Sequence, residues 1–118
     1  MLRINGQEIY LTRGDTAELK FPAFVDDNEE ETPYIFQEDD EVWFRLAQVA
    51  GQKPVRIEKQ CDIDSENSTA ILYLDSSDTE NLKFGKYRYE VELISEGEHY
   101  TYIEDQLFEI SKEVETHD

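Results

Sequence analysis

The chain has little cysteine and no long hydrophobic run. Cys61 is the single cysteine among 118 residues, so no disulfide can form within the chain and folding does not depend on an oxidising compartment. No apolar stretch approaches the roughly 20 residues that span a bilayer. The first residues alternate in polarity instead of forming the apolar core of a signal peptide. We therefore expect a soluble protein that stays inside the cell or is released by lysis.

Basic side chains are also few, with 11 lysines and arginines against 29 acidic residues and a formal net charge of −18. Phosphates are bound by lysine and arginine with release of counterions, so this balance argues against nucleic acid and anionic membranes as partners. Seven tyrosines, six phenylalanines and one tryptophan supply the core material that disordered acidic chains lack. We expect a single β-sandwich domain in residues 1–112 and a flexible acidic C-terminal tail in residues 113–118.

Apolar and polar residues alternate along most of the chain, whereas a helical period of 3.6 residues is almost absent. The alternation is clearest in residues 87–93 and recurs in residues 16–24 and 41–49. A period of two is the signature of half-buried strands. One short helical turn is expected in residues 76–82, before Gly85 ends it. The pattern predicts an all-β fold, specifically an antiparallel immunoglobulin-like β-sandwich of about seven to nine short strands.

The residue types of catalytic sites are scarce. Cys61 could pair with His99 or His117, but the spacing specifies no third group, and one cysteine with two histidines falls short of any zinc motif. The motifs GxGxxG, GxxxxGK[ST], HExxH and GxSxG are absent. We expect no enzymatic activity and no cofactor.

The acidic residues gather in clusters that resemble divalent-ion ligands in composition. Residues 62–73 begin as an EF-hand loop does, but Asn67 stands where glycine is required and Tyr73 stands where glutamate is required. Two other clusters could bind an ion weakly, although a repulsive acidic surface is the simpler interpretation. Their members are Asp26, Asp27, Glu29, Glu30 and Glu31 in the first, and Glu38, Asp39, Asp40 and Glu41 in the second. We predict no metal site.

Three aromatic residues are candidate partner contacts. Trp43 falls on the face of its predicted strand opposite Val42 and Phe44, so either both faces are buried or Trp43 meets another chain. Tyr100 and Tyr102 share one face and either belong to the core or form a platform for a partner or a sugar.

A series of short motifs runs along nearly the whole chain, about residues 9–111. They are, in order, RGDTA (13–17), YIF (34–36), DDEVWF (39–44), ILYL (71–74), DT (78–79), GKYRYEVEL (85–93) and FEI (108–110). This order resembles the small immunoglobulin-like domains of phage and prophage structural proteins, typified by the N-terminal domain of baseplate upper proteins. In the first motif, Gly14 and Asp15 are expected to bend the chain between two strands.

The resemblance implies a non-enzymatic virion structural or assembly module of the baseplate, tail or neck region. Its partners would be other phage structural proteins or itself, and it would be found in the virion, or in the host cytoplasm before assembly. The alternative function is a host carbohydrate-binding or adhesion module that uses an aromatic platform. Capsid, tail and lysis genes beside the coding sequence would favour the first function, and polysaccharide-utilisation genes the second.

Overall fold

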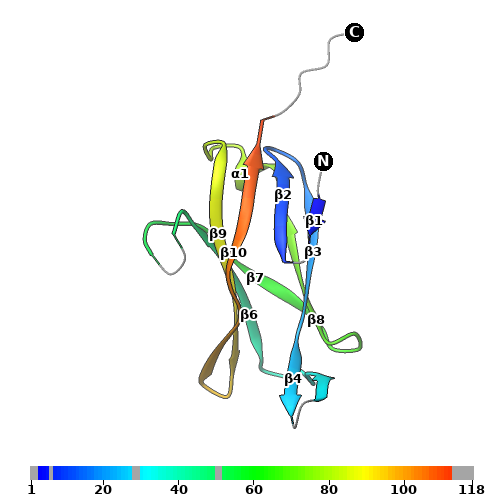
Figure 1. The fold of residues 1–118 in the computed structure, drawn as a ribbon. Coiled ribbons are helices and arrows are strands. Elements are labelled where there is room, and N and C mark those ends of the chain that lie inside the picture. Colours follow the sequence, from blue (N-terminus) through cyan, green and yellow to red (C-terminus); the bar gives the residue numbers. More distant parts are fainter. Residues whose placement is uncertain (1–2, 6, 28–29, 50–51, 113–118) are drawn as a thin grey trace.

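The computed structural model describes residues 3–5, 7–27, 30–49 and 52–112, so the predicted tail in residues 113–118 lies outside the described part. It confirms an all-β fold, with ten strands and one short helix among the described residues (Figure 1). The elements are β1 (Arg3–Asn5), β2 (Glu8–Thr12), β3 (Ala17–Pro22), β4 (Phe24–Asp27), β5 (Glu30–Pro33), β6 (Glu41–Ala47), β7 (Val55–Asp64), β8 (Thr69–Leu74), α1 (Ser76–Thr79), β9 (Gly85–Ser95) and β10 (Glu98–Ser111).

Eight strands form one sheet in the order β1-β2-β10-β9-β6-β7-β8-β3, and β4 pairs with β5 in a separate hairpin. The expectation of a wholly antiparallel sheet is wrong, because β2 runs parallel to β10, with Ile9 opposite Phe108. The Arg13 N–H donates to the Ser111 carbonyl at 3.0 Å and continues this pairing into the turn after β2. Alternation predicts which face of a strand is buried but not the direction of its neighbour, so the sheet is mixed.

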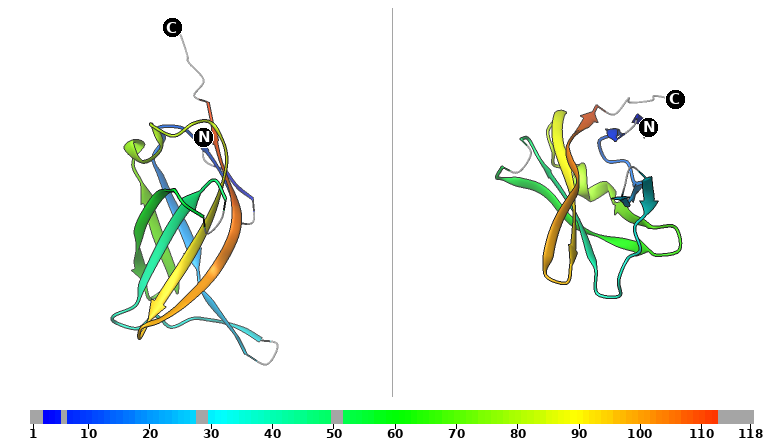
Figure 2. Two further views of the ribbon diagram at one scale, coloured as in Figure 1. Left: turned by 90° about the vertical axis from the view of Figure 1, so that its left-hand side faces the viewer. Right: turned by 60° about the horizontal axis from the view of Figure 1, so that its bottom comes forward.

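The sheet curls back on itself at β7. Residues 55–61 of β7 pair with β6, whereas residues 62–64 pair with β8. The strand therefore belongs to both halves of the sheet and brings β8 and β3 across the inner face (Figure 2). Phe21 on β3 stacks against Phe44 on β6, with ring centroids 6.0 Å apart. The core lies between the two halves.

The predicted alternation of β9 is confirmed by burial, since Tyr87, Tyr89, Val91 and Leu93 are all buried. The buried tyrosines satisfy their hydroxyl groups at the margins of the core. Tyr87 donates to the Lys83 carbonyl at 2.7 Å, and Tyr89 donates to the Gln7 carbonyl. A tyrosine can therefore fill a core position while its polar end remains paired.

The predicted bend at the RGDTA motif is present between β2 and β3. The Asp15 N–H donates to the Thr12 carbonyl at 3.1 Å, and Gly14 has a φ of 85°, a conformation that glycine adopts without strain. The Gly14 N–H donates to Thr79 Oγ1 at 2.9 Å. Because Thr79 belongs to α1, this bond ties the predicted helical turn to the bend.

Candidate functional site

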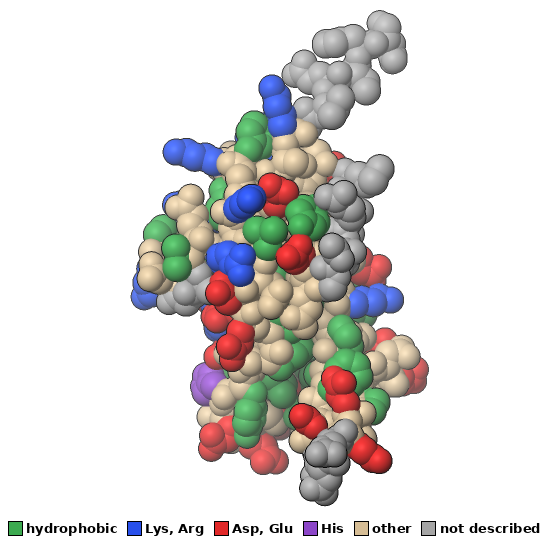
Figure 3. Space-filling view, viewed as in Figure 1, with side chains coloured by type: hydrophobic (Ala, Val, Ile, Leu, Met, Phe, Trp, Pro, Cys, Tyr) green, Lys and Arg blue, Asp and Glu red, His purple; other side chains and the backbone are tan. Residues whose placement is uncertain are grey.

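A groove of about 370 Å³ opens between β4 and the β9–β10 hairpin. Phe24 and Val25 line it on β4, and Tyr100 and Tyr102 line it on β10. Three of these side chains are largely exposed: Phe24 at 51%, Val25 at 42% and Tyr100 at 53%. Figure 3 shows this hollow in the lower half of the molecule, with hydrophobic side chains on both sides. Exposed apolar residues gathered around one hollow are typical of a binding surface.

Tyr102 has a structural role within this groove. Its hydroxyl donates to the Phe21 carbonyl at 3.0 Å, so the side chain links β10 to β3. Burial raises the pKa of Tyr102, and the nearby Cys61 adds to that effect. Of the two predicted contact tyrosines, Tyr100 is therefore the one that presents its ring to solvent.

One edge of β10 is open along the groove. On one side β10 pairs with β9 from Glu98 to Ile110. On the other side β2 pairs only with residues 108–111. Within the part of the chain that the structure describes, residues 98–107 have no strand neighbour on that second side. An open edge carries unpaired N–H and C=O groups that can receive another strand.

Trp43 lies on the opposite face of the sheet from Tyr100. Residues directly opposite each other on neighbouring strands share a face of the sheet. Val42, Leu93 and Tyr100 follow one another across β6, β9 and β10 and therefore lie on one face. Trp43 is opposite Glu92, on the other face. Val42 and Leu93 are buried, so Trp43 points outward. The structure therefore brings Tyr100 and Tyr102 to one groove and places Trp43 elsewhere.

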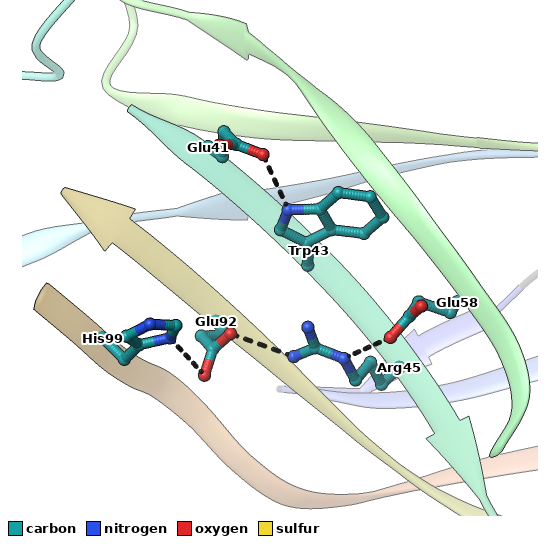
Figure 4. Close-up of polar contacts among 6 residues, drawn as sticks. All are labelled: Glu41, Trp43, Arg45, Glu58, Glu92 and His99. Carbon is teal, nitrogen blue, oxygen red and sulfur yellow. Dashed lines mark hydrogen bonds and ion pairs between the residues drawn. The ribbon is translucent and has the colours of Figure 1, made fainter. Parts of the chain in front are cut away.

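Polar contacts connect the side chains on the outer face around Trp43 (Figure 4). The Trp43 Nε1–H donates to Glu41 at 3.1 Å. Arg45 bridges Glu58 at 2.6 Å and Glu92 at 3.1 Å, and His99 Nδ1 lies 3.4 Å from Glu92. Burial alone would lower the pKa of Arg45, but its bonds to the two glutamates raise it. The Arg45 guanidinium on β6 thus joins glutamates on both neighbouring strands, Glu58 on β7 and Glu92 on β9.

Asp40, considered in the sequence only as a member of an acidic cluster, has a supporting role that the sequence did not predict. Asp40 Oδ2 accepts hydrogen bonds from the Tyr34 hydroxyl and from the Gln37 N–H, each at 2.8 Å. Burial acts to raise the pKa of Asp40, yet hydrogen bonds from Ser95, Gln37 and Tyr34 outweigh it, and the pKa is lowered. Asp40 thus supports Tyr34, a groove-lining residue. The signal in the sequence was an aspartate just before a strand, where its carboxylate can accept a local N–H.

Two of the acidic residues that resemble ion ligands in the sequence, Asp40 and Asp64, are engaged with donors of the protein itself. The segment 62–73 forms the β7–β8 hairpin, where the Asp64 carboxylate accepts bonds from the Asn67 N–H at 3.3 Å and side-chain amide at 2.8 Å. Among the described residues, no three histidine, cysteine or acidic side chains group as metal ligands. Glu29 lies outside the described residues. The absence of a metal site remains a prediction.

The thiol of Cys61 is buried in the core. Burial, with a smaller contribution from Asp62, raises its pKa to about 12, so it carries a proton at neutral pH and is a poor nucleophile. His99, one of the two histidines considered with it, is exposed at the outer face, and His117 lies outside the described residues. No helix of the described part is long and apolar enough to cross a membrane.

Comparisons with known proteins find similarity among solved structures only. No protein-family model matches the sequence, and no curated protein matches it. Among solved structures, the chain is similar to the N-terminal domain of phage TP901-1 ORF48, with a TM-score of 0.47 and 17% sequence identity, over 89% of this chain and 83% of that chain.

Proposed function

We propose that the chain is a non-enzymatic structural or assembly module of a phage or prophage virion, in the baseplate, tail or neck region, which acts through protein–protein contacts. The observation that carries this proposal is the ordered series of motifs in residues 9–111 that resembles the immunoglobulin-like domains of phage structural proteins. An immunoglobulin-like fold is part of the proposal. The stacking of Phe21 on Phe44 across the two halves of the curled sheet supports it.

The surface supports a role in contacts. The groove presents Phe24, Val25 and Tyr100 to solvent beside the open edge of β10. Apolar side chains and unpaired backbone groups together are what a protein partner can cover. The net charge of −18 disfavours nucleic acid as that partner.

The proposal is tested by locating the chain in particles. The prophage of the encoding strain is induced, the particles are purified on a density gradient, and the chain is measured in them by quantitative mass spectrometry. We expect a fixed copy number relative to the tail proteins, and antibody labelling at one place on the particle. Particles that lack the chain while it remains in the soluble lysate would refute the proposal.

A carbohydrate-binding function is the competing interpretation, and the exposed ring of Tyr100 is the observation that favours it. The platform of this function was predicted to use Tyr100, Tyr102 or Trp43, and aromatic residues that contact one sugar together need to share a face. Trp43 and Tyr100 lie on opposite faces, so one sugar cannot contact both, and the groove offers Tyr100 without Trp43. Titration with cell-wall polysaccharide fragments separates the two functions: saturable binding that Tyr100→Ala abolishes would favour the carbohydrate function.

A further inference from the structure

We propose that the groove between β4 and the β9–β10 hairpin binds an extended segment of a partner protein in which apolar residues alternate with lysine or arginine. The segment adds as a strand to the open edge of β10. This inference deepens the proposed function, on which it rests for the origin of the partner. Addition of a strand to an exposed sheet edge is an established mode of peptide recognition.

The pairing of β10 shows where the added strand would lie. Residues 98–101 pair with β9 on one side, and the groove lies beside them. A strand placed there would lie on the same side of β10 as β2, which pairs with residues 108–111 of β10. Register shifts follow Thr101, so regular pairing is limited to about five residues of the partner, roughly 16 Å of extended chain.

The groove supplies pockets for alternate side chains of that strand. Side chains of a strand point to opposite faces in turn, so every second residue would enter the groove between Phe24 on β4 and Tyr100 on β10. Buried Leu93 also lines this space. The partner residues that enter are therefore apolar, and those between them remain at the rim.

The rim is acidic, which selects the charge of the partner. The residues that line the groove fall in the segments 23–34 and 93–102, which contain five and two acidic residues and no lysine or arginine. Glu96 and Glu98 line the groove itself. On the face shown in Figure 3, acidic side chains gather at the lower end and most basic ones lie in the upper half. Lysine or arginine at the rim positions of the partner would complement this field.

The β4–β5 hairpin gives a second reason for a cationic partner. Asp26 is directly opposite Glu31 in this hairpin, and like charges in opposed positions destabilise a strand pair. Two strands alone are marginally stable. A cationic segment beside β4 would offset this repulsion, whereas a second copy of the chain would bring a further net charge of −18. The observations therefore favour a different, cationic protein over self-association.

The test uses three synthetic peptides with blocked ends: KVKVKVK, KSKSKSK and EVEVEVE. Binding to the full chain is measured by fluorescence anisotropy at fixed salt. We expect KVKVKVK to bind at least about tenfold more tightly than KSKSKSK, since the apolar contacts are worth more than about 1.4 kcal/mol, and EVEVEVE not to bind. Equal binding of both lysine peptides would overturn the proposal, because it would show charge attraction alone.

Strand addition is tested separately with N-methylated peptides. In an extended peptide the N–H groups of the valines point to one edge and those of the lysines to the other. Methylation of one set should abolish binding, while methylation of the other set should leave it unchanged. Equal effects of both sets would contradict pairing with the β10 edge.

Variants of the chain assign the binding to the groove. Tyr100→Ser and Phe24→Ser should each weaken KVKVKVK binding about tenfold. Tyr73→Ser is the matched control, because Tyr73 on β8 is 49% exposed and does not line the groove. Equal losses in all three variants would overturn the assignment, as would a dimer of the free chain that Tyr100→Ser dissociates, since a second copy would then occupy the groove. Failure of the peptides while the chain is present in particles would refute this inference and leave the proposed function intact.

Discussion

At the scale of single residues, two buried threonines use their hydroxyl groups differently. Thr79 Oγ1 accepts the Gly14 N–H, whereas Thr69 Oγ1 is buried with no hydrogen-bond partner in the described part of the chain. We expect Thr79→Val to lower the free energy of unfolding by about 1–2 kcal/mol, because a backbone donor loses its acceptor. Thr69→Val should be neutral or stabilising. Urea unfolding of both variants checks this, and equal losses would contradict it.

Asp40 predicts a pH-dependent contribution to stability. Asp40→Asn should lower the free energy of unfolding by about 1–2 kcal/mol at pH 7, since a charged acceptor of two hydrogen bonds is replaced by a neutral one. The pKa of Asp40 is lowered by folding, so its contribution is complete above the unfolded value of about 3.9 and is lost as the pH falls through the lower folded value. The two proteins should therefore become more alike in stability as the pH falls below about 3.9.

Urea unfolding at pH 7 and at pH 3 measures this difference. Asp39→Asn is the control, because Asp39 is an exposed neighbour and its replacement should change stability by less than about 0.5 kcal/mol. A loss in Asp40→Asn that is the same at both pH values would show that the carboxylate charge has no part in it.

At the scale of elements, β9 begins at a residue whose backbone conformation favours glycine. Gly85 has a φ of +139° and no atom within 4 Å of where a Cβ would lie, so a larger side chain would be strained rather than crowded. Gly85→Val should lower the free energy of unfolding by about 1–3 kcal/mol. Thermal unfolding measures the change, with Gly97→Asn as control, because Gly97 has a φ of +79° that asparagine tolerates better. A valine variant with the wild-type melting temperature would refute the requirement.

Some of the elements could be predicted from the sequence and others could not. The alternation in residues 87–93 predicts β9 and its buried face correctly, and the acidic run that begins at Asp26 lies in the β4–β5 hairpin. The bend of β7 between two partners was not predicted, because a ten-residue strand looks the same in sequence whether it pairs with one neighbour or with two. The groove was missed because it depends on where β4 lies beside the β9–β10 hairpin, and the open edge of β10 was missed because β2 pairs only with residues 108–111.

At the scale of the whole molecule, the net charge of −18 predicts how stability responds to salt. Repulsion among like charges disfavours the compact state, and raising the ionic strength from 0.01 M to 0.15 M shortens the screening length from about 30 Å to about 8 Å. We expect the melting temperature to rise over this range, and any self-association to strengthen. Differential scanning fluorimetry and light scattering measure the two effects.

Magnesium or calcium at the same ionic strength is the control, and we expect neither ion nor a chelator to shift the melting temperature beyond the effect of sodium chloride. A divalent ion that raises it further, with the gain abolished by Asp39→Asn, would assign an ion site to the second acidic cluster. A melting temperature that falls with sodium chloride would show that ion pairs such as Arg45–Glu58 outweigh the repulsion.

The sequence by itself determined the all-β class, the buried faces of the strands, the RGDTA bend and the acidic character of the surface. These features are local, because alternation, turn residues and charge depend on neighbouring residues in the sequence and not on which segments pack together. Only the tertiary structure decided that β2 pairs in parallel with β10, that Tyr100 and Trp43 lie on opposite faces, and that Asp40 supports a groove. Backbone donors and acceptors are the same in every residue except proline, so strand neighbours are chosen by the packing of distant segments and not by the strand's own pattern.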